Sequence, residues 1–146
     1  MHKIIVGCDP NAKEMKDAVV RYLADRGYDV TDRNSDDVIY ANTAEAVAKA
    51  VTSGAFDRGV LMCGTGIGMC IAANKVRGAY AALLSDAYSA ERARKSNNAN
   101  IACIGAFTIG VELAKNLLDV FLTSEYQEGT ASEPKVRRIE ELDARL

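Results

Sequence analysis

The sequence has very little histidine and no pair of cysteines at metal-binding spacing. His2 is the one histidine in 146 residues, and the four cysteines form no CxxC pair. A zinc site is therefore not expected, because such sites draw on clustered histidine and cysteine ligands. A histidine-dependent catalytic triad would have to use a residue at the extreme N-terminus.

An excess of one charge and long apolar runs are also missing. The chain has 18 Lys and Arg against 20 Asp and Glu, a net charge of -2, with both signs interspersed. This balance argues against a nucleic-acid partner and against a polybasic membrane anchor. No apolar run approaches a membrane span and no signal-peptide region precedes the first apolar segment, so we expect a cytoplasmic protein. The cysteines lie in or beside apolar segments, as reduced thiols do.

What is present indicates a globular α/β protein. Hydrophobic residues make up 49% of the chain, enough for one domain with its own core over residues 1–146. We expect the C-terminal segment, 127–146, to pack on the body or on a partner subunit.

Short apolar runs of strand length alternate with longer segments of helical period. The expected strands cover residues 3–8, 29–31, 58–62, 79–84 and 101–104, several of them apolar on both faces. Expected helix boundaries are an end near Gly27, a cap at Asn42 or Thr43, a start within residues 63–68, and a cap at Asp86. The alternation predicts a three-layer α/β/α sandwich with a five-stranded, mostly parallel, Rossmann-like sheet.

The stretch CGTGIGMC, residues 63–70, follows the third expected strand and is the strongest site candidate. In such folds ligands bind beyond the carboxyl ends of the strands. The glycines are spaced G-x-G-x-G, not G-x-G-x-x-G as in dinucleotide folds, and the Gly-Lys-Ser/Thr of a Walker loop is missing. What remains is a run of backbone N–H groups suited to an anion or a developing oxyanion, beside a cysteine.

Two roles are open for Cys63. A thiol near the start of a helix has its thiolate favoured by the helix dipole and can act as a base or nucleophile. The alternative is a small buried hydrophobic residue that ends a strand, which is what we expect of Cys8, Cys70 and Cys103. The glycines that follow Cys63 favour the chemical role.

Further motifs are spread along the chain. They read GCD at 7–9, YAN at 40–42, GVLMCGTGIG at 59–68, AANKV at 72–76 and NNAN at 97–100. Together they resemble the ribose-5-phosphate isomerase B family, which includes the galactose-6-phosphate isomerase subunits, from residue 3 to about residue 126. The resemblance implies an α/β/α homodimer or tetramer that interconverts aldose and ketose phosphates without metal or cofactor.

The resemblance also implies roles for individual residues. Aldose–ketose isomerisation moves a proton between C1 and C2 through a cis-enediolate, so it needs a base and donors for the developing oxyanion. By similarity Cys63 is the base, and the amides of Gly64, Gly66, Ile67 and Gly68 hold the enediolate oxygens. Thr65 and Asp9 assist ring opening or orient hydroxyls, and Asn97 reaches in from a second subunit. Tyr40 either bonds a sugar hydroxyl or simply packs.

The chain departs from the family pattern where the substrate is expected to open and where its phosphate is held. Pro10 and Ser96 stand in place of histidines, the second of which opens the ring, and Phe107 stands in place of a phosphate-binding arginine. Arginine–phosphate hydrogen bonds contribute about 1.5–3 kcal/mol each, so their loss weakens phosphate binding unless other cations replace them. The candidate replacements are Lys135, Arg137 and Arg138.

These departures leave three functions open. The first is a cofactor-independent isomerase, an intramolecular oxidoreductase, of a small sugar phosphate such as a tetrose or pentose phosphate. A tetrose phosphorylated at its end carbon cannot close a normal furanose ring, so Ser96, a weak proton relay at best, is consistent with it. The second is an isomerase of unphosphorylated sugars, with an apolar distal pocket at Phe107. The third is a non-catalytic sugar-binding subunit of a hetero-oligomer, which the intact loop at Cys63 disfavours.

Overall fold

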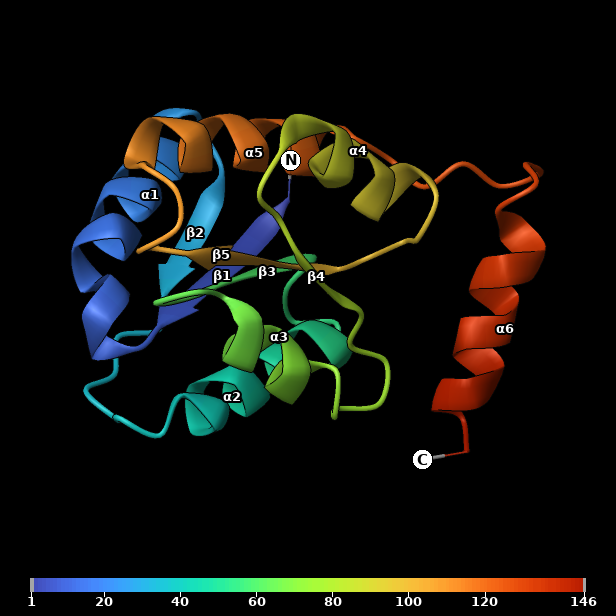
Figure 1. The fold of residues 1–146 in the computed structure, drawn as a ribbon, viewed down its shortest axis with the longest axis horizontal. Coiled ribbons are helices and arrows are strands. Elements are labelled where there is room, and N and C mark those ends of the chain that lie inside the picture. The colour runs from blue at the N-terminus through green and yellow to red at the C-terminus, as the bar shows by residue number, and fades with distance from the viewer. Residues whose placement is uncertain (1, 146) are drawn as a thin grey trace.

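The computed structural model describes residues 2–145, and a five-stranded sheet forms its centre (Figure 1). The strands are β1 (Lys3–Cys8), β2 (Asp29–Asp32), β3 (Arg58–Cys63), β4 (Ala81–Leu83) and β5 (Ile101–Gly105). They lie in the order β2-β1-β3-β5-β4, and every pairing is parallel. The expected sheet is confirmed, and it is parallel throughout. From β1 the chain goes to β2 on one side, and from β3 it goes to β4 and then β5 on the other side, so a topological switch point lies between β1 and β3.

Helices cover both faces of the sheet (Figure 1). On one face lie α1 (Lys13–Asp25), α4 (Ala87–Lys95) and α5 (Val111–Thr123), and on the other α2 (Tyr40–Thr52) and α3 (Ile67–Ala73). Successive residues of a strand point to opposite faces, so Ile4 and Val6 join the first apolar core and Ile5 joins the second. These two cores explain why the strands are apolar on both faces.

All four expected helix boundaries can be compared with the structure. Helix α1 ends at Asp25, close to Gly27, and α3 begins at Ile67, within residues 63–68, as expected. Asp86 caps α4 as expected, because its Oδ1 accepts a hydrogen bond from the Ser89 amide at 2.7 Å. The expected cap at Asn42 or Thr43 is wrong, since α2 already begins at Tyr40 and Thr43 is buried in it. Asp37 organises this start, accepting bonds from the Ile39 amide at 2.8 Å and from Asn42 Nδ2 at 2.9 Å.

The last helix, α6 (Glu133–Asp143), stands beside the sheet on the side of β4 (Figure 1). Its contacts with the body include the buried Val136 and the Asp143 carboxylate, which accepts bonds from the Gly78 amide at 2.8 Å and the Tyr80 hydroxyl at 2.9 Å. Ile139 and Leu142 remain 44% and 46% exposed. The helix is therefore anchored along one stripe only.

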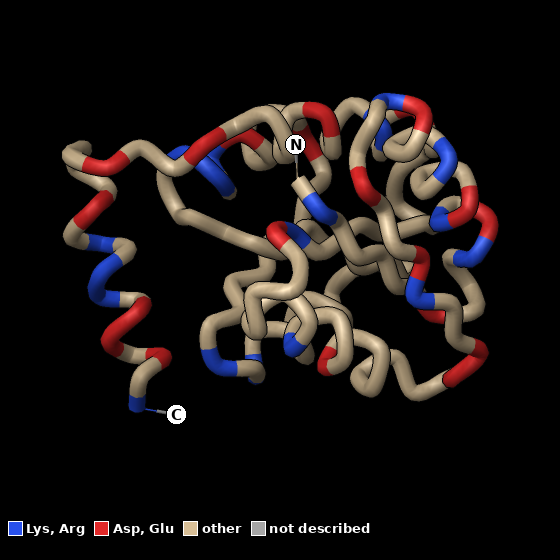
Figure 2. The backbone as a smooth tube through the Cα atoms, turned by 180° about the vertical axis from the view of Figure 1, so that it is seen from behind, with Lys and Arg blue, Asp and Glu red and all other residues tan. Residues whose placement is uncertain are grey.

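Acidic and basic positions are interspersed along the chain, including along α6 (Figure 2). Within residues 2–145, no helix is both long enough and apolar enough to cross a membrane.

Candidate active site

The candidate site lies where β1, β3 and β5 end, at the carboxyl edge of the sheet. Backbone hydrogen bonds join the segments that leave these strands: the Asp9 amide donates to Met62 O at 3.0 Å, and the Ala106 amide donates to Cys63 O at 2.8 Å. The Phe107 amide donates to Gly64 O at 2.9 Å. Asp9, the glycine loop and Phe107 are thus held together at the switch point, where α/β folds bind ligands.

Cys63 combines features of both roles considered for it. Its side chain is 6% exposed and belongs to the apolar core under α2 and α3, as a buried strand-end residue would. Its Sγ also accepts a hydrogen bond from the Gly66 amide at 3.1 Å, the contact that orients the sulfur toward the loop. The helix that follows, α3, has only seven residues, so the nearby amide matters more than the helix dipole.

Aromatic rings close on the glycine loop from two sides. A Cβ on Gly64 would lie 2.9 Å from the Phe107 ring, and a Cβ on Gly68 would lie 2.6 Å from the Tyr40 hydroxyl oxygen. Gly66 has φ +79°, and a Cβ there would lie 2.9 Å from the carbonyl carbon of Ile104. The alternating glycines are therefore required by close approach and, at position 66, by backbone conformation.

Two amides of the loop already have partners. Gly66 donates to Cys63, and the Ile67 amide donates to Thr65 Oγ1 at 3.2 Å. To hold substrate oxygens, each of these two amides must first break its present hydrogen bond. Thr65 and Ile67 are exposed side chains at the mouth of the loop.

Asp9 and Pro10 begin the short 3-10 turn η1 (Pro10–Ala12) that follows β1. Asp9 is 8% exposed and lies just beyond the carboxyl end of β1. Its Oδ1 accepts a hydrogen bond from the Asn11 amide at 3.1 Å, so the carboxylate stabilises this turn. Pro10 is exposed and occupies the first position of the turn.

Four of the expected site residues do not reach Cys63 of the same chain. Helix α4 starts beside the carboxyl end of β4 and runs back to the start of β5, which places Ser96 and Asn97 at the amino edge of the sheet. There, Ser96 Oγ and Asn97 Nδ2 both donate to Arg92 O, at 3.1 and 2.9 Å. Lys135 and Arg137 lie on α6, away from the glycine loop (Figure 1).

A cavity of about 350 Å³ opens between α1 and the segment that leads from β5 to α5. Phe107 contributes to its wall, together with Asn11, Glu14, Met15 and Val111 among others, and its lining contains neither lysine nor arginine. Phe107 is 71% exposed, so the ring stands between this cavity and Gly64. Within one chain, this cavity offers an apolar wall and a carboxylate rather than a cation.

The other thiols differ from one another, which the sequence did not indicate. Cys8 and Cys103 are buried as expected, and burial raises the pKa of Cys8 to about 11. Cys70 is only half-buried, with its Sγ 3.4 Å from Ala81 O. A hydrogen bond with Cys103 lowers the pKa of Cys70 to about 7 and raises that of Cys103. Cys70 therefore packs against the core under α2 and α3 but lies at its edge, less buried than we expected.

Among the described residues, no group of three or more His, Cys, Asp and Glu side chains is arranged to hold a metal ion. The polar groups of the glycine loop and of the segments that lie against it are a thiol, a carboxylate, a threonine hydroxyl, a tyrosine hydroxyl and backbone amides. Such a set can move protons and stabilise oxyanions.

Comparison with known proteins gives a consistent result. A family model described as Ribose/Galactose Isomerase matches residues 4–140. The D-erythrulose-4-phosphate isomerase of Pectobacterium atrosepticum is 47% identical over 143 residues, which cover 95% of this chain and 93% of that protein. The Ribose-5-P isomerase B of Listeria innocua is 46% identical over 144 residues, which cover 97% of each chain.

A solved structure agrees with these sequence relationships. The ribose-5-phosphate isomerase B of Clostridium thermocellum superimposes with a TM-score of 0.92 at 37% identity, covering 98% of both chains. Sequence, fold and matched length coincide over nearly the whole molecule. The chain belongs to the Ribose/Galactose Isomerase family and is an isomerase of the aldose–ketose type.

Proposed function

We propose that this protein interconverts the aldose and ketose forms of a small sugar phosphate, a tetrose or pentose phosphate, through a cis-enediolate and without a cofactor. The observation that carries the proposal is the position of the Cys63 sulfur, 3.1 Å from the Gly66 amide at the switch point of the sheet. A relative named as a D-erythrulose-4-phosphate isomerase, 47% identical, supports a four-carbon substrate.

In the proposed reaction Cys63, as thiolate, takes the proton from C2 of the aldose. The C2–H electron pair forms the C1–C2 double bond, the carbonyl electrons move to the C1 oxygen, and loop amides stabilise that oxyanion. The C1 oxygen gains a proton and the C2 hydroxyl loses one, with Asp9 and Thr65 as carriers. Cys63 then returns its proton to C1, which gives the ketose and restores the thiolate.

Ser96 supports the shorter sugar within this class. A pentose phosphate must be opened from its ring by an acid, and a serine hydroxyl is a poor general acid near neutral pH. A tetrose with phosphate on its last carbon has no free hydroxyl there to close a furanose ring. The site would then need no ring-opening acid, and a serine at position 96 would not lower the rate.

The phosphate requires a cation that the cavity beside Phe107 does not supply. We propose that Lys135 and Arg137 of α6 supply this cation to the site of a second copy, where Asn97 contributes a neutral amide. Exposed apolar side chains support a homodimer or tetramer: Ile67, Ile71, Leu83 and Tyr88 are 50%, 58%, 42% and 73% exposed. Such side chains around a site suit a subunit interface.

An isomerase of unphosphorylated sugars is the second candidate, and one observation favours it. The cavity next to the loop is lined by Phe107 and Glu14 and by no basic residue. A carboxylate repels a phosphate dianion and accepts hydrogen bonds from a sugar hydroxyl.

The test is a panel of D-erythrulose 4-phosphate, ribose 5-phosphate and their unphosphorylated counterparts, assayed in deuterated water with the wild-type protein and Cys63→Ser. We expect turnover of the phosphorylated tetrose with deuterium at the exchanged carbon. In Cys63→Ser the rate should fall by about 10²–10⁴-fold. Turnover of free sugars alone would establish the second candidate, and no turnover of any sugar by the purified chain would favour a non-catalytic subunit. An active Cys63→Ser variant would exclude the sulfur as the base.

A further inference from the structure

Arg94 of α4 is a buried cation at the amino edge of the sheet, opposite the glycine loop of its own chain. It is 3% exposed, and burial together with nearby Arg58 lowers its pKa to about 10, so it stays protonated at neutral pH. A buried charge is costly unless hydrogen bonds satisfy it. The partners of the guanidinium therefore show what this charge holds in place.

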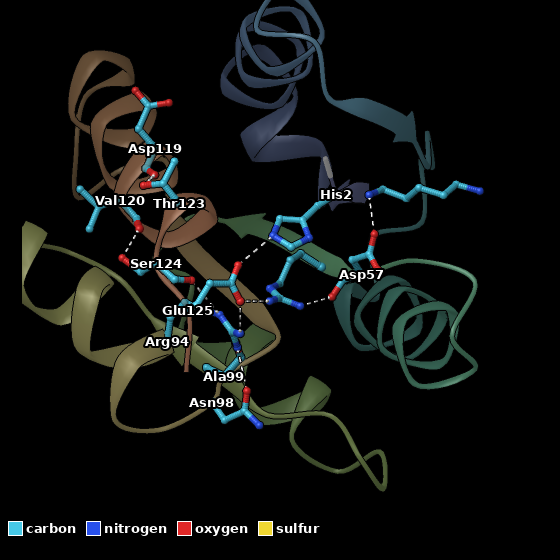
Figure 3. A network of polar contacts seen from close by, with 12 residues as sticks. His2, Asp57, Arg94, Asn98, Ala99, Asp119, Val120, Thr123, Ser124 and Glu125 are labelled. Atoms are coloured by element: carbon cyan, nitrogen blue, oxygen red, sulfur yellow. Dashed lines mark hydrogen bonds and ion pairs between the residues drawn. The ribbon is translucent and has the colours of Figure 1, made fainter. Parts of the chain in front are cut away.

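The guanidinium joins two segments that lie far apart in the sequence (Figure 3). Nη1 donates to Ala99 O at 2.6 Å and to Asn98 Oδ1 at 3.1 Å, and Nε donates to Ser124 O at 3.4 Å. Nη2 lies 3.7 Å from the Glu125 carboxylate. Arg94 thus connects the turn before β5 with the segment that leads to α6.

The turn is held in an uncommon backbone conformation. Asn98 has φ +52°, the one positive φ outside glycine among residues 2–145. A left-handed backbone costs an ordinary residue about 1–2 kcal/mol and persists where neighbours hold it. Here the Asn98 side chain is bonded to Arg94, and the Asn98 and Ala99 amides donate to Arg94 O at 3.1 Å and Ala93 O at 2.8 Å. The residue displayed just before this turn is Asn97, which is exposed.

We propose that Arg94 is a positioning residue for the active site of a neighbouring subunit. It fixes the turn at Asn98 and so aims Asn97, and it ties that turn to the segment that carries α6. The inference rests on the proposed function, in which Asn97 and α6 act on a second copy. Lysine at this position keeps the charge, yet its single ammonium lacks the planar fork that binds several oxygens at once.

Two variants test the role by kinetics. Arg94→Lys removes the fork, while Asn98→Gly keeps Arg94, accepts a positive φ without strain and loses only the side-chain contact. In both we expect kcat on the accepted sugar phosphate to fall about tenfold or more, because a misplacement near 1 Å is costly, while KM changes little. If the contact between Arg94 and Asn98 only stabilises the fold, the variants should show wild-type kcat when assayed well below their melting temperatures. That result in Asn98→Gly would overturn the proposal.

Complementation tests whether the effect crosses between subunits. Arg94→Lys and Cys63→Ser chains with different tags are co-expressed, and mixed dimers are isolated by both tags. In a mixed dimer, one site combines the intact Cys63 of the first chain with the intact Arg94 of the second. We expect about half of wild-type activity, because one of two sites is restored. If Arg94 serves only its own chain, the one site that keeps Cys63 still runs about tenfold slower. The mixed dimer then has about one-twentieth of wild-type activity.

The outcomes separate this inference from the proposed function. A wild-type protein that turns over no sugar phosphate, or an active Cys63→Ser homodimer, refutes the proposed function itself. An active wild type and an inactive Cys63→Ser, combined with a mixed dimer that is not restored, refute only the role of Arg94. A protein that forms no mixed dimer and is active as a monomer also refutes that role.

Discussion

The two edges of the sheet use polar groups in different ways. At the carboxyl edge, a thiol and backbone amides meet in a loop that requires glycines, and one oxygen of the neighbouring Asp9 carboxylate is bonded to its own turn. At the amino edge, Arg94 and Arg58 share the Glu125 carboxylate, with His2 3.4 Å from it (Figure 3). Close packing constrains the first edge, whereas hydrogen bonds from a buried guanidinium hold the second, so substitutions at the two edges should fail for different reasons.

The largest effect is expected from Gly66→Ala at the carboxyl edge. The new Cβ would meet the Ile104 backbone at 2.9 Å in addition to the strain of φ +79°. We expect the free energy of unfolding to fall by at least about 3 kcal/mol, and activity to fall with it because the displaced backbone moves the amide that donates to Cys63. Chemical denaturation and steady-state kinetics measure both quantities.

Gly54→Ala is the matched control for that substitution. Gly54 has φ +85°, yet a Cβ there meets nothing within 4 Å. Its cost should be the backbone strain alone, about 1–2 kcal/mol, with unchanged activity. Equal costs at positions 54 and 66 would mean that close approach at the loop is unimportant.

Gly68→Ala should separate activity from stability. The new methyl group would displace the Tyr40 ring, which is 41% exposed and free to move, while alanine favours the helix by about 1 kcal/mol. We expect little change in stability and a roughly tenfold loss of kcat/KM, since the loop loses its aromatic neighbour. Tyr40→Ala should show the same loss, and the double variant no more than either alone. Fully additive losses would contradict a shared cause.

The pH dependence of alkylation should distinguish the thiols near the carboxyl edge. The pKa of Cys70 lies below its ordinary value of 9.0, at about 7, so its thiolate forms as the pH rises through 7. Cys8, with a pKa of about 11, should remain unreactive across this range. Iodoacetamide labelling followed by mass spectrometry gives the midpoint for each residue.

Cys103→Ala provides the control for the labelling experiment. It removes the hydrogen bond that is the main cause of the low pKa, so the Cys70 midpoint should move up toward 9.0. A midpoint near 9.0 in the wild-type protein would show that the thiol pair has no effect on Cys70.

Glu125→Gln at the amino edge should have the smallest effect. The Glu125 side chain is 65% exposed and lies 3.7 Å from both arginines, which is long for a strong ion pair. We expect a loss below about 1 kcal/mol in urea denaturation, smaller still at high salt. A loss above about 2 kcal/mol would place this carboxylate among the main supports of the amino edge.

Local sequence patterns were sufficient for most of the fold. The apolar run at 3–8 coincides with β1, and Asp86 caps α4 as its position before a helical segment indicated. The start of α2 was misplaced because Asp37, three residues before Tyr40, organises it through an irregular turn that has no apolar period. The partial exposure of Cys70 was not foreseen because it depends on how α3 packs beside β4, where the Cys70 Sγ lies 3.4 Å from Ala81 O.

The sequence by itself determined the parallel α/β architecture, the glycine loop with its cysteine, and the family, because strand and helix periodicity and contiguous motifs are local properties of the chain. Only the tertiary structure decided which side chains close on that loop, which thiols interact, and that Ser96, Asn97, Lys135 and Arg137 lie away from Cys63 in the same chain. Those relations depend on crossovers and on packing between distant segments. A side chain's partners there are set by the direction in which each helix returns across the sheet.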